Sequence, residues 1–528
     1  MWTVKPRLVS LSSDRKAKLL VTVILLGLLF ITAANRPFSS LYKYVHPEKD
    51  LSKTAENLNR HRTQAAKEYF VSARNAGSRQ EENGQQARAD QEYDRNAGSR
   101  QLRNGQEARS DQEHDRNAGS RQLGNGQEAR ADQEHDSLRQ STLPAQARVT
   151  VAIVSVRRKS SAVNLGYVIQ SAAALDSLLR QQGSDDLFGD SILFVCNVDD
   201  HPERHSDAAF LKDHVAFVER YGVSSAGLGL NLSMAVPGML GQSYHEVRHH
   251  DVYDKERYDY MFCLQAAMAF RPHYVLIVED DALALPDMPS VVQHALRRLT
   301  STLATPVGHR DDEQDGESLL PLNPCASDLM SAEGLNGDER GFRGRVLSGQ
   351  TAGFVYLKLF FPLYWQGFAF ELLRILDLVC MTAVLTSVFV VVLQMTVSTR
   401  GFPPNRIIGA IFVFSLILCE LIGRQNLNEM RRFSKHFYRL QQSPDCCTPA
   451  MLYPCDVVPA LLTSLSRCRA QRHVDLCIAD FVKRSGLPAY SLEPNLFSHV
   501  GMVTSLNMNN KHAEELLFHS KITQFSSA

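Results

Sequence analysis

The chain has 528 residues, enough for more than one domain, and its 57 basic residues balance 57 acidic ones. A protein without net charge lacks the excess of lysine and arginine that attracts nucleic acid, so we expect no nucleic-acid partner. No other polyanion is implied as a partner.

The first apolar segment covers residues 19–34, which carry no charge and follow five basic residues. Sixteen helical residues reach only about 24 Å, so a membrane span here requires a thin bilayer or a snorkelling lysine. The basic flank places residues 1–18 in the cytosol as a short tail. Thr32-Ala33-Ala34 would alternatively suit a signal peptidase. We favour an uncleaved anchor, and either reading places the rest of the chain in the lumen.

Residues 74–136 are three copies of a 21-residue unit, each beginning Arg-Asn-Ala-Gly-Ser-Arg. The copies contain almost no large apolar residue beyond Leu102 and Leu123, and each has an Asn-Gly pair, so no coiled-coil seam can form. This composition buries too little apolar surface to offset the entropy of ordering. We therefore predict that residues 35–147 form a flexible stem, with a typical span of about 60 Å.

From Arg148 onward the pattern is that of a globular domain. Strand-like segments rich in β-branched residues alternate with segments that have apolar residues at helical spacing. This order predicts a parallel sheet with helices on both faces, in which ligands bind beyond the carboxyl ends of the strands. The predicted elements are strands at 149–156, 191–198 and 273–278 and helices at 164–179 and 258–270.

The third of these strands ends in three consecutive carboxylates, Glu279, Asp280 and Asp281. Burying them requires a compensating partner, and a divalent cation with oxygen ligands is the simplest one. Because side chains alternate along a strand, Glu279 and Asp281 are predicted to share one face and Asp280 to point to the other. The pattern favours a metal-diphosphate site over the alternative, a strand end that runs into a helix capped by Asp287.

Polar, irregular sequence follows between 299 and 345 and is predicted to be a loop or lid. Two further apolar segments, 378–397 and 407–423, are joined by nine residues, which allow only a hairpin turn. Their length and all-round apolar character favour a membrane hairpin over two buried core helices. Counting the crossings places the connector in the cytosol. A hairpin over residues 372–423 divides the lumenal domain into 148–371 and 424–528.

Eight cysteines lie outside the apolar segments, a number typical of a secretory compartment in which disulfides form. Their pairing cannot be read from the sequence. Asn231-Leu232-Ser233 is a lone glycosylation sequon.

Two histidine patterns compete as candidate sites. His245-Glu246-Val247-Arg248-His249 fits H-E-x-x-H, in which two histidines bind zinc and the glutamate acts as a base. Its surroundings are densely polar, and the longer pattern fails at Val252 and Lys255, so we favour a solvated surface over a zinc protease. His499 is the better candidate, because it lies between a proline and a glycine and could bind a metal or a diphosphate. The alternative for His499 is a structural histidine in a turn.

Several blocks of the chain are informative together: the strand ending in Val278-Glu-Asp-Asp281, residues 357–368, the hairpin, residues 446–451, and Glu493-Pro-Asn-Leu496 with His499. In this order they resemble the Golgi GPI-glycan N-acetylgalactosaminyltransferases, the family of post-GPI-attachment-to-proteins enzymes. The resemblance is close over 148–507, loose over 1–34, and absent from the repeats. It implies a GT-A-type glycosyltransferase domain of the α/β class, interrupted by the membrane hairpin, in the Golgi membrane with the catalytic domain in the lumen.

The resemblance also implies the substrates and the site. The donor would be UDP-N-acetylgalactosamine, the acceptor the first mannose of GPI anchors on GPI-anchored proteins, and the cofactor a divalent ion, expected to be Mn²⁺. Glu279, Asp280 and Asp281 would occupy the DXD-like position, with Glu279, Asp281 and His499 as the metal ligands. The other residues expected to contact the donor are Val156, Arg157, Thr448, Pro449 and Ala450.

The expected reaction is an inverting transfer in which a carboxylate deprotonates the attacking mannose hydroxyl. Glu371 is the candidate base, because it precedes the hairpin at the lumenal membrane surface. The alternative for Glu371 is an interfacial acid at a helix N-terminus. The alternatives for the whole chain are a UDP-sugar transferase with another donor or acceptor, a zinc protease, and a membrane scaffold without activity.

Overall fold

The computed structural model describes residues 34–47, 50–76, 147–158, 165–221, 251–304, 353–368, 371–397, 404–502, 513–521 and 525. Residues 19–33 of the predicted anchor, the repeats beyond residue 76, the H-E-x-x-H motif and the sequon at Asn231 lie outside these ranges. The chain forms two units, one of residues 1–66 and 147–526 and one of residues 67–146, of which 67–76 are helical.

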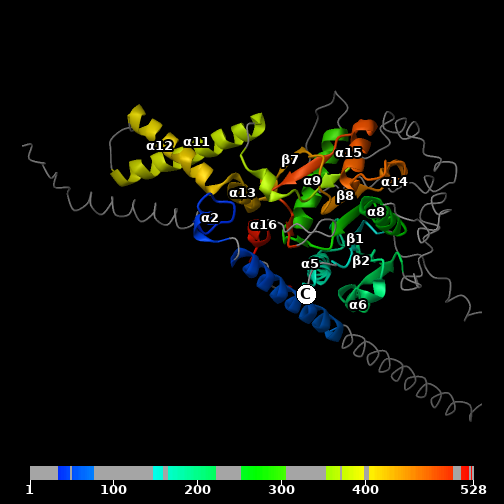
Figure 1. Cartoon of the computed structure of the whole chain (residues 1–528). Coiled ribbons are helices and arrows are strands. Elements are labelled where there is room, and N and C mark those ends of the chain that lie inside the picture. The colour runs from blue at the N-terminus through cyan, green and yellow to red at the C-terminus, as the bar shows by residue number, and fades with distance from the viewer. Residues whose placement is uncertain are drawn as a thin grey trace, which may run out of the picture. The chain divides into compact units, whose positions relative to one another are not determined.

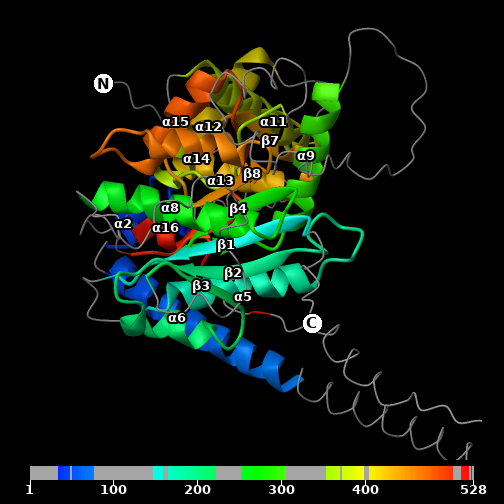
Figure 2. The same cartoon turned by 90° about the vertical axis from the view of Figure 1, so that its right-hand side faces the viewer.

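An eight-stranded sheet with the order β3-β2-β1-β4-β8-β6-β9-β7 forms the centre of the larger unit (Figure 2). Its first half is parallel, since β1 pairs with β2 and with β4, and β3 pairs with β2. The three strands predicted from β-branched runs are confirmed and are buried. The bounds of this half are β1 Val149–Ser155, β2 Ile192–Asn197, β3 Ala216–Glu219 and β4 Tyr274–Glu279.

The second half of the sheet is mostly antiparallel, which differs from the prediction of a parallel sheet. β8 runs antiparallel to β4 and to β6, and β7 runs antiparallel to β9. β6 comes before the two long apolar helices and the others after them, so both halves of the chain contribute strands to one sheet. The bounds are β6 Leu357–Lys358, β7 Arg439–Gln442, β8 Ala450–Pro454 and β9 Tyr490–Glu493.

Helices cover both faces of the sheet, as predicted (Figure 2). On one face α8, α14 and α15 pack around the largest apolar core, and the disulfide between Cys196 and Cys263 ties α8 to β2. On the other face lie α5 and α6. A further helix, α9, continues through Ala304 and so enters the segment predicted to be irregular from residue 299; residues 305–345 lie outside the described ranges. The bounds are α5 Tyr167–Arg180, α6 Ser206–Leu211, α8 Val252–Met268, α9 Met288–Ala304, α14 Val458–Ser466 and α15 Val474–Ser485.

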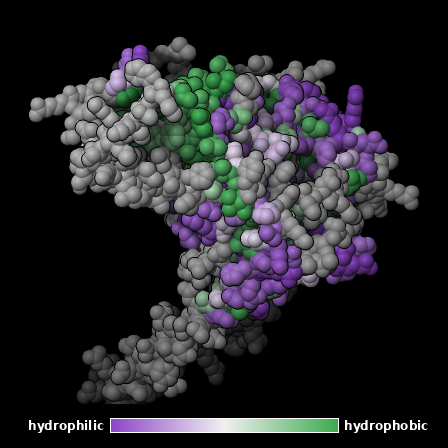
Figure 3. All heavy atoms as spheres, turned by 60° about the vertical axis from the view of Figure 1, so that its left-hand side comes forward, coloured by the Kyte–Doolittle hydropathy of each residue, from purple (hydrophilic) through white to green (hydrophobic). Residues whose placement is uncertain are grey.

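Two long apolar helices, α11 (Leu372–Val397) and α12 (Asn405–Ile422), project from the domain as a hairpin (Figure 1). Both are long and apolar enough to cross a membrane, and only 17% of each span is buried. Apolar side chains gather over this part of the surface in Figure 3. The exposure contradicts the alternative of two buried core helices and fits a membrane protein. Short helices then lead back into the sheet: α13 (Arg424–Asn428), η4 (Glu429–Phe433) and η5 (Lys435–Phe437).

The start of the predicted flexible stem differs from the structure. Residues 50–76 form a helix, and its part in the larger unit buries one stripe of side chains. Two members of the stripe are polar: Asn59 Nδ2 donates to Val500 O at 2.9 Å and Arg62 Nη2 to His519 O at 2.9 Å. Residues 34–47 are also described and include α2 (Tyr42–Val45). The prediction of a flexible stem failed here because the buried stripe contains few large apolar residues, so the sequence lacks the apolar periodicity by which an amphipathic helix is recognised.

Candidate functional site

The three carboxylates lie where β4 ends, and two further strands bring His499 to them. Asp280 and Asp281 form the turn into β5 (Ala282–Ala284), which pairs antiparallel with β10 (Phe497–His499). His499 is opposite Ala282, so its Nε2 lies 3.1 Å from Asp281 Oδ2. The Val500 N–H also donates to Asp281 O at 2.8 Å. The structure therefore brings together two residues that the sequence places far apart.

Arg158 is the cation that compensates the buried aspartates. Its Nη2 lies 2.5 Å from Asp280 Oδ1 and 2.9 Å from Asp281 Oδ2, and all three side chains are at most 10% exposed. The ring of Tyr167 lies 5.1 Å from the guanidinium carbon. Burial lowers the pKa of Arg158, but Asp281 and Asp280 raise it by more, so the guanidinium stays charged. The sequence pattern predicted a metal ion in this role and missed the arginine, although a basic pair follows the first strand.

Glu279 has a different environment from its two neighbours. Thr448 Oγ1 donates to Glu279 Oε1 at 3.0 Å, and the Glu279 N–H donates to Pro449 O at 2.8 Å. The antiparallel pairing of β8 with β4 explains these contacts, because it sets Ala450 opposite Val278. Thr448, Pro449 and Ala450 therefore adjoin the acidic strand end, and their contact with a donor stays a prediction.

The predicted alternation of the three acids does not hold. Asp280 and Asp281 meet the same guanidinium, because the regular strand ends at Glu279 and the next two residues turn. Ser155 Oγ also donates to Asp280 Oδ2 at 3.3 Å, and Ser171 Oγ donates to the Asp280 carbonyl at 2.8 Å. Contacts from β1 and α5 thus hold Asp280 in one position.

Two other predicted residues, Val156 and Arg157, lie at the carboxyl edge of the sheet, and Arg157 contacts a different acid. The Arg157 N–H donates to Asp199 Oδ2 at 2.9 Å, and its Nε is 3.9 Å from the same oxygen. Asp199 follows β2, so this contact links the ends of the first two strands. Val156 is partly buried against the main core. Both residues lie at the edge where parallel sheets bind ligands.

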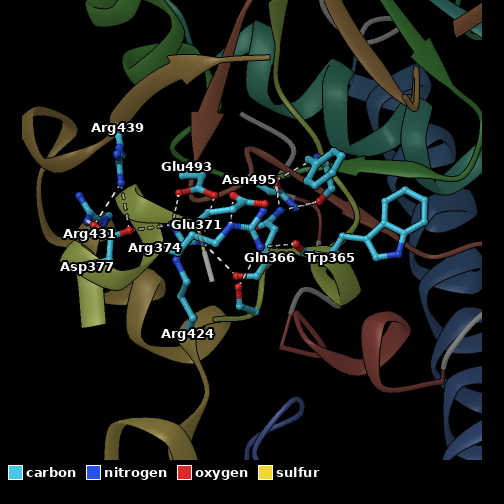
Figure 4. Close-up of polar contacts among 12 residues, drawn as sticks. Trp365, Gln366, Glu371, Arg374, Asp377, Arg424, Arg431, Arg439, Glu493 and Asn495 are labelled. Carbon is cyan, nitrogen blue, oxygen red and sulfur yellow. Dashed lines mark hydrogen bonds and ion pairs between the residues drawn. The ribbon is translucent and has the colours of Figure 1, made fainter. Parts of the chain in front are cut away.

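The structure does not bring the candidate base to the carboxylates. Glu371 precedes α11, its side chain is 65% exposed, and its carboxylate pairs with Arg374 Nε at 3.0 Å. Figure 4 shows Glu371 beside Arg374. Within the described ranges its side chain contacts neither Asp281 nor His499. This environment is that of an interfacial acid at the start of a helix.

The side chains at this site provide part of the coordination that a divalent ion requires. Asp281 Oδ2 and His499 Nε2 are close enough to bind one ion, and Glu279 points to Thr448 instead. Among the described residues no group of three His, Cys, Asp or Glu side chains is arranged to hold a metal. An ion here would therefore need oxygen ligands from a bound molecule, such as a diphosphate.

Two arginines that follow the hairpin, Arg424 and Arg432, hold the segment that leads to His499, and Figure 4 shows the first of them between Asp377 and Glu493. Arg424 Nη2 lies 2.7 Å from Glu493 Oε2, at the end of β9, and 2.8 Å from Asp377 Oδ2 of α11. Burial lowers the pKa of Arg424, but its bonds to Glu493 and Asp377 raise it by more. Arg432 Nη2 donates to the carbonyl of Asn495. Sequence patterns could not reveal these contacts, which join residues up to 69 positions apart.

Gly501 allows the chain to pass close to Asp281. A Cβ at residue 501 would lie 1.9 Å from Asp281 Oδ2, a distance that van der Waals repulsion between non-bonded atoms excludes. The neighbouring Met502 N–H donates to Tyr167 Oη at 3.1 Å, and Asn59 holds Val500 from the N-terminal helix. Three separate elements therefore fix this segment against the aspartates.

The chain was compared with models of known protein families. Residues 149–313 and 341–498, more than half of the chain, match a family model described as GPI-N-acetylgalactosamine transferase PGAP4. The second stretch runs through the hairpin. The match includes Arg158, Asp281 and Thr448, and it ends one residue before His499.

Proposed function

Because this chain belongs to the GPI-N-acetylgalactosamine transferase PGAP4 family, we propose that it transfers N-acetylgalactosamine from UDP-N-acetylgalactosamine to GPI anchors on GPI-anchored proteins. The proposed acceptor is the first mannose of the anchor, and the proposed fold type is GT-A. The observation that carries the proposal is the family match on both sides of the hairpin, around one cluster of Arg158, Asp281 and His499.

In the proposed reaction the cluster binds the diphosphate of the donor. Asp281 and His499 would hold a divalent ion, expected to be Mn²⁺, which supplies positive charge to the UDP leaving group. Arg158 fixes Asp280 and Asp281, so neither carboxylate has to reorganise when the donor binds. Thr448 orients Glu279 at the rim of the same site. Val156, Arg157, Pro449 and Ala450 are proposed to complete the donor pocket.

The membrane hairpin supports a lipid-borne acceptor. The ion pairs of Arg424 join α11 directly to β9, so the domain lies at one end of the hairpin. We propose that this end faces the Golgi lumen and that the transfer inverts the configuration of the sugar. Glu371 remains the proposed base, since the mannose of a membrane-anchored glycan would arrive at the height where α11 begins.

The donor is tested by incubating the detergent-solubilised chain with a panel of UDP-sugars and a GPI-type acceptor. We expect UDP release and transfer with UDP-N-acetylgalactosamine, and a loss of both when manganese is replaced by EDTA. Transfer from a different UDP-sugar would leave the proposed site unchanged and would identify another sugar nucleotide as the donor. Full activity in EDTA would remove the ion from the proposal and leave Arg158 as the cation near the diphosphate.

Gly501→Ala is expected to lower the transfer rate by about tenfold to a hundredfold, because the added methyl group displaces the Asp281 carboxylate. The rate is measured with the purified chain at saturating donor. Gly409→Ala is a suitable control, since no atom lies within 4 Å of the Cβ it would add. An unchanged rate in Gly501→Ala would mean that the position of Asp281 does not limit the reaction.

A further inference from the structure

Four aromatic side chains lie exposed on the segments that flank the hairpin. Two precede α11, in η3 (Leu363–Gln366), and two follow α12, in η4 and η5. Their side chains are half to four-fifths exposed, which is unusual for large apolar groups that face water. These residues, called the aromatic rim below, are Tyr364 (50% exposed), Trp365 (51%), Phe433 (83%) and Phe437 (59%).

Hydrogen bonds and ion pairs place the rim beside the first turns of α11. Arg374, in the first turn, donates from Nη1 to the Trp365 carbonyl at 2.8 Å. Arg431 lies 3.6 Å from Asp377, in the second turn, and donates to the Phe437 carbonyl at 3.3 Å. In Figure 4 the indole of Trp365 points away from this network. The two flanking segments therefore lie at the same end of the hairpin.

The length of α11 places this end in the polar layer of a bilayer. The helix has 26 residues, whereas its uncharged part begins only at Leu378. A span of 20 residues fills the hydrocarbon core of about 30 Å, and the remaining turn and a half adds about 9 Å. Arg374 and Asp377 lie in this extra length, at the depth of the lipid headgroups.

We propose that the aromatic rim inserts into the headgroup layer and that its partner is the lipid surface itself. Aromatic rings favour this depth, because their apolar faces meet acyl chains while the edges remain hydrated. Exposed Lys435, between Phe433 and Phe437, suits the phosphates of the headgroups. The surface is continuous with the lipid-facing sides of α11 and α12, where Leu372 and Leu373 are exposed as well. The domain is thereby held at a fixed height and tilt over the membrane.

The insertion is tested with the fluorescence of Trp365. The chain has only two tryptophans, so Trp2→Phe leaves Trp365 as the sole emitter. The full chain is reconstituted in phosphatidylcholine nanodiscs whose acyl chains carry bromine near the carbonyl end or near the methyl end. We expect a loss of emission with both lipids that is larger with the shallow bromine. Emission equal to that in unbrominated lipid would overturn the proposal, since Trp365 would then face water.

A second measurement distinguishes a lipid partner of the aromatic rim from a protein partner. Its readout is sugar transfer, so it rests on the proposed function. Phe433→Ser with Phe437→Ser is expected to lower transfer to a GPI glycolipid in nanodiscs about fivefold and to leave transfer to the water-soluble GPI glycan unchanged. Leu476→Ser, an exposed change on α15, is the matched control. A loss with a GPI-anchored protein in nanodiscs but none with the GPI glycolipid, or an equal loss with the glycolipid and the soluble glycan, would contradict lipid contact. If the unmodified chain transfers no sugar, the proposed function fails, and the quenching result still decides the insertion.

Discussion

Asp281→Ala is expected to lower sugar transfer by about a hundredfold or more and to leave the domain folded. The carboxylate has three roles in the structure, because it contacts His499, pairs with Arg158 and approaches Gly501. Its removal takes away the proposed contact to the ion and the diphosphate but almost no core volume. Arg158 keeps Asp280 as a partner, so the buried guanidinium is not left alone.

The effect is measured twice, as transfer by the purified chain and as the N-acetylhexosamine on GPI anchors from cells that carry only the variant. Asp281→Asn keeps the volume and removes the charge, so it separates the loss of charge from the loss of shape. Asp190→Asn serves as the control, since Asp190 is half exposed and pairs with Arg148 at the start of β1. GPI anchors that still carry the extra sugar in Asp281→Ala cells would refute the assignment of the catalytic site.

Arg424→Ala is expected to lower the free energy of unfolding by about 3–5 kcal/mol, because it leaves a buried carboxylate without its cation. Glu493 would lose both bonds to the guanidinium, whereas Asp377 would keep Arg439 and Arg431. Activity should fall as well, since Glu493 precedes the segment that carries His499. The unfolding temperature of the detergent-solubilised chain measures the change.

Two further variants make this result specific. Arg472→Ala removes a surface ion pair with Asp480 and is expected to cost less than about 1 kcal/mol. Arg424→Met combined with Glu493→Gln removes both charges at once and should recover part of the stability lost in Arg424→Ala. Equal unfolding temperatures for Arg424→Ala and Arg472→Ala would show that the buried network does not hold the domain together.

Local patterns predicted those parts of the fold that depend on local chemistry. The β-branched runs at β1, β2 and β4, the apolar spacing of α5 and the two membrane-length helices all follow from burial on one or two faces. The acidic end of β4 predicted a charged partner, since burial of consecutive carboxylates requires one, and the structure shows Arg158 in contact with Asp280 and Asp281.

The partners themselves are long-range contacts, and these escaped prediction. Arg158 reaches Asp280 across 122 positions, and its neighbour Arg157 has the same side-chain chemistry but pairs with Asp199 instead. Only the pairing of β1 with β4 and the course of the chain after Ser155 decide between the two arginines. The antiparallel half of the sheet was missed for a similar reason, because the direction of a strand leaves no trace in its composition.

The contacts that the chain makes just after the predicted N-terminal anchor bear on what a change in the number of repeats can affect. Ser39 Oγ donates to the carbonyl of Leu421, in the last turn of α12, at 2.8 Å, and Asn426 Nδ2 donates to Pro37 O at 2.6 Å. The polypeptide therefore joins the base of the hairpin before the repeats begin, and helix residues 50–66 and β1 belong to the same unit. Gaining or losing a 21-residue copy therefore changes the number of residues between two segments, 50–66 and β1, that belong to the same unit. A change in repeat number therefore need not move β1 relative to the hairpin.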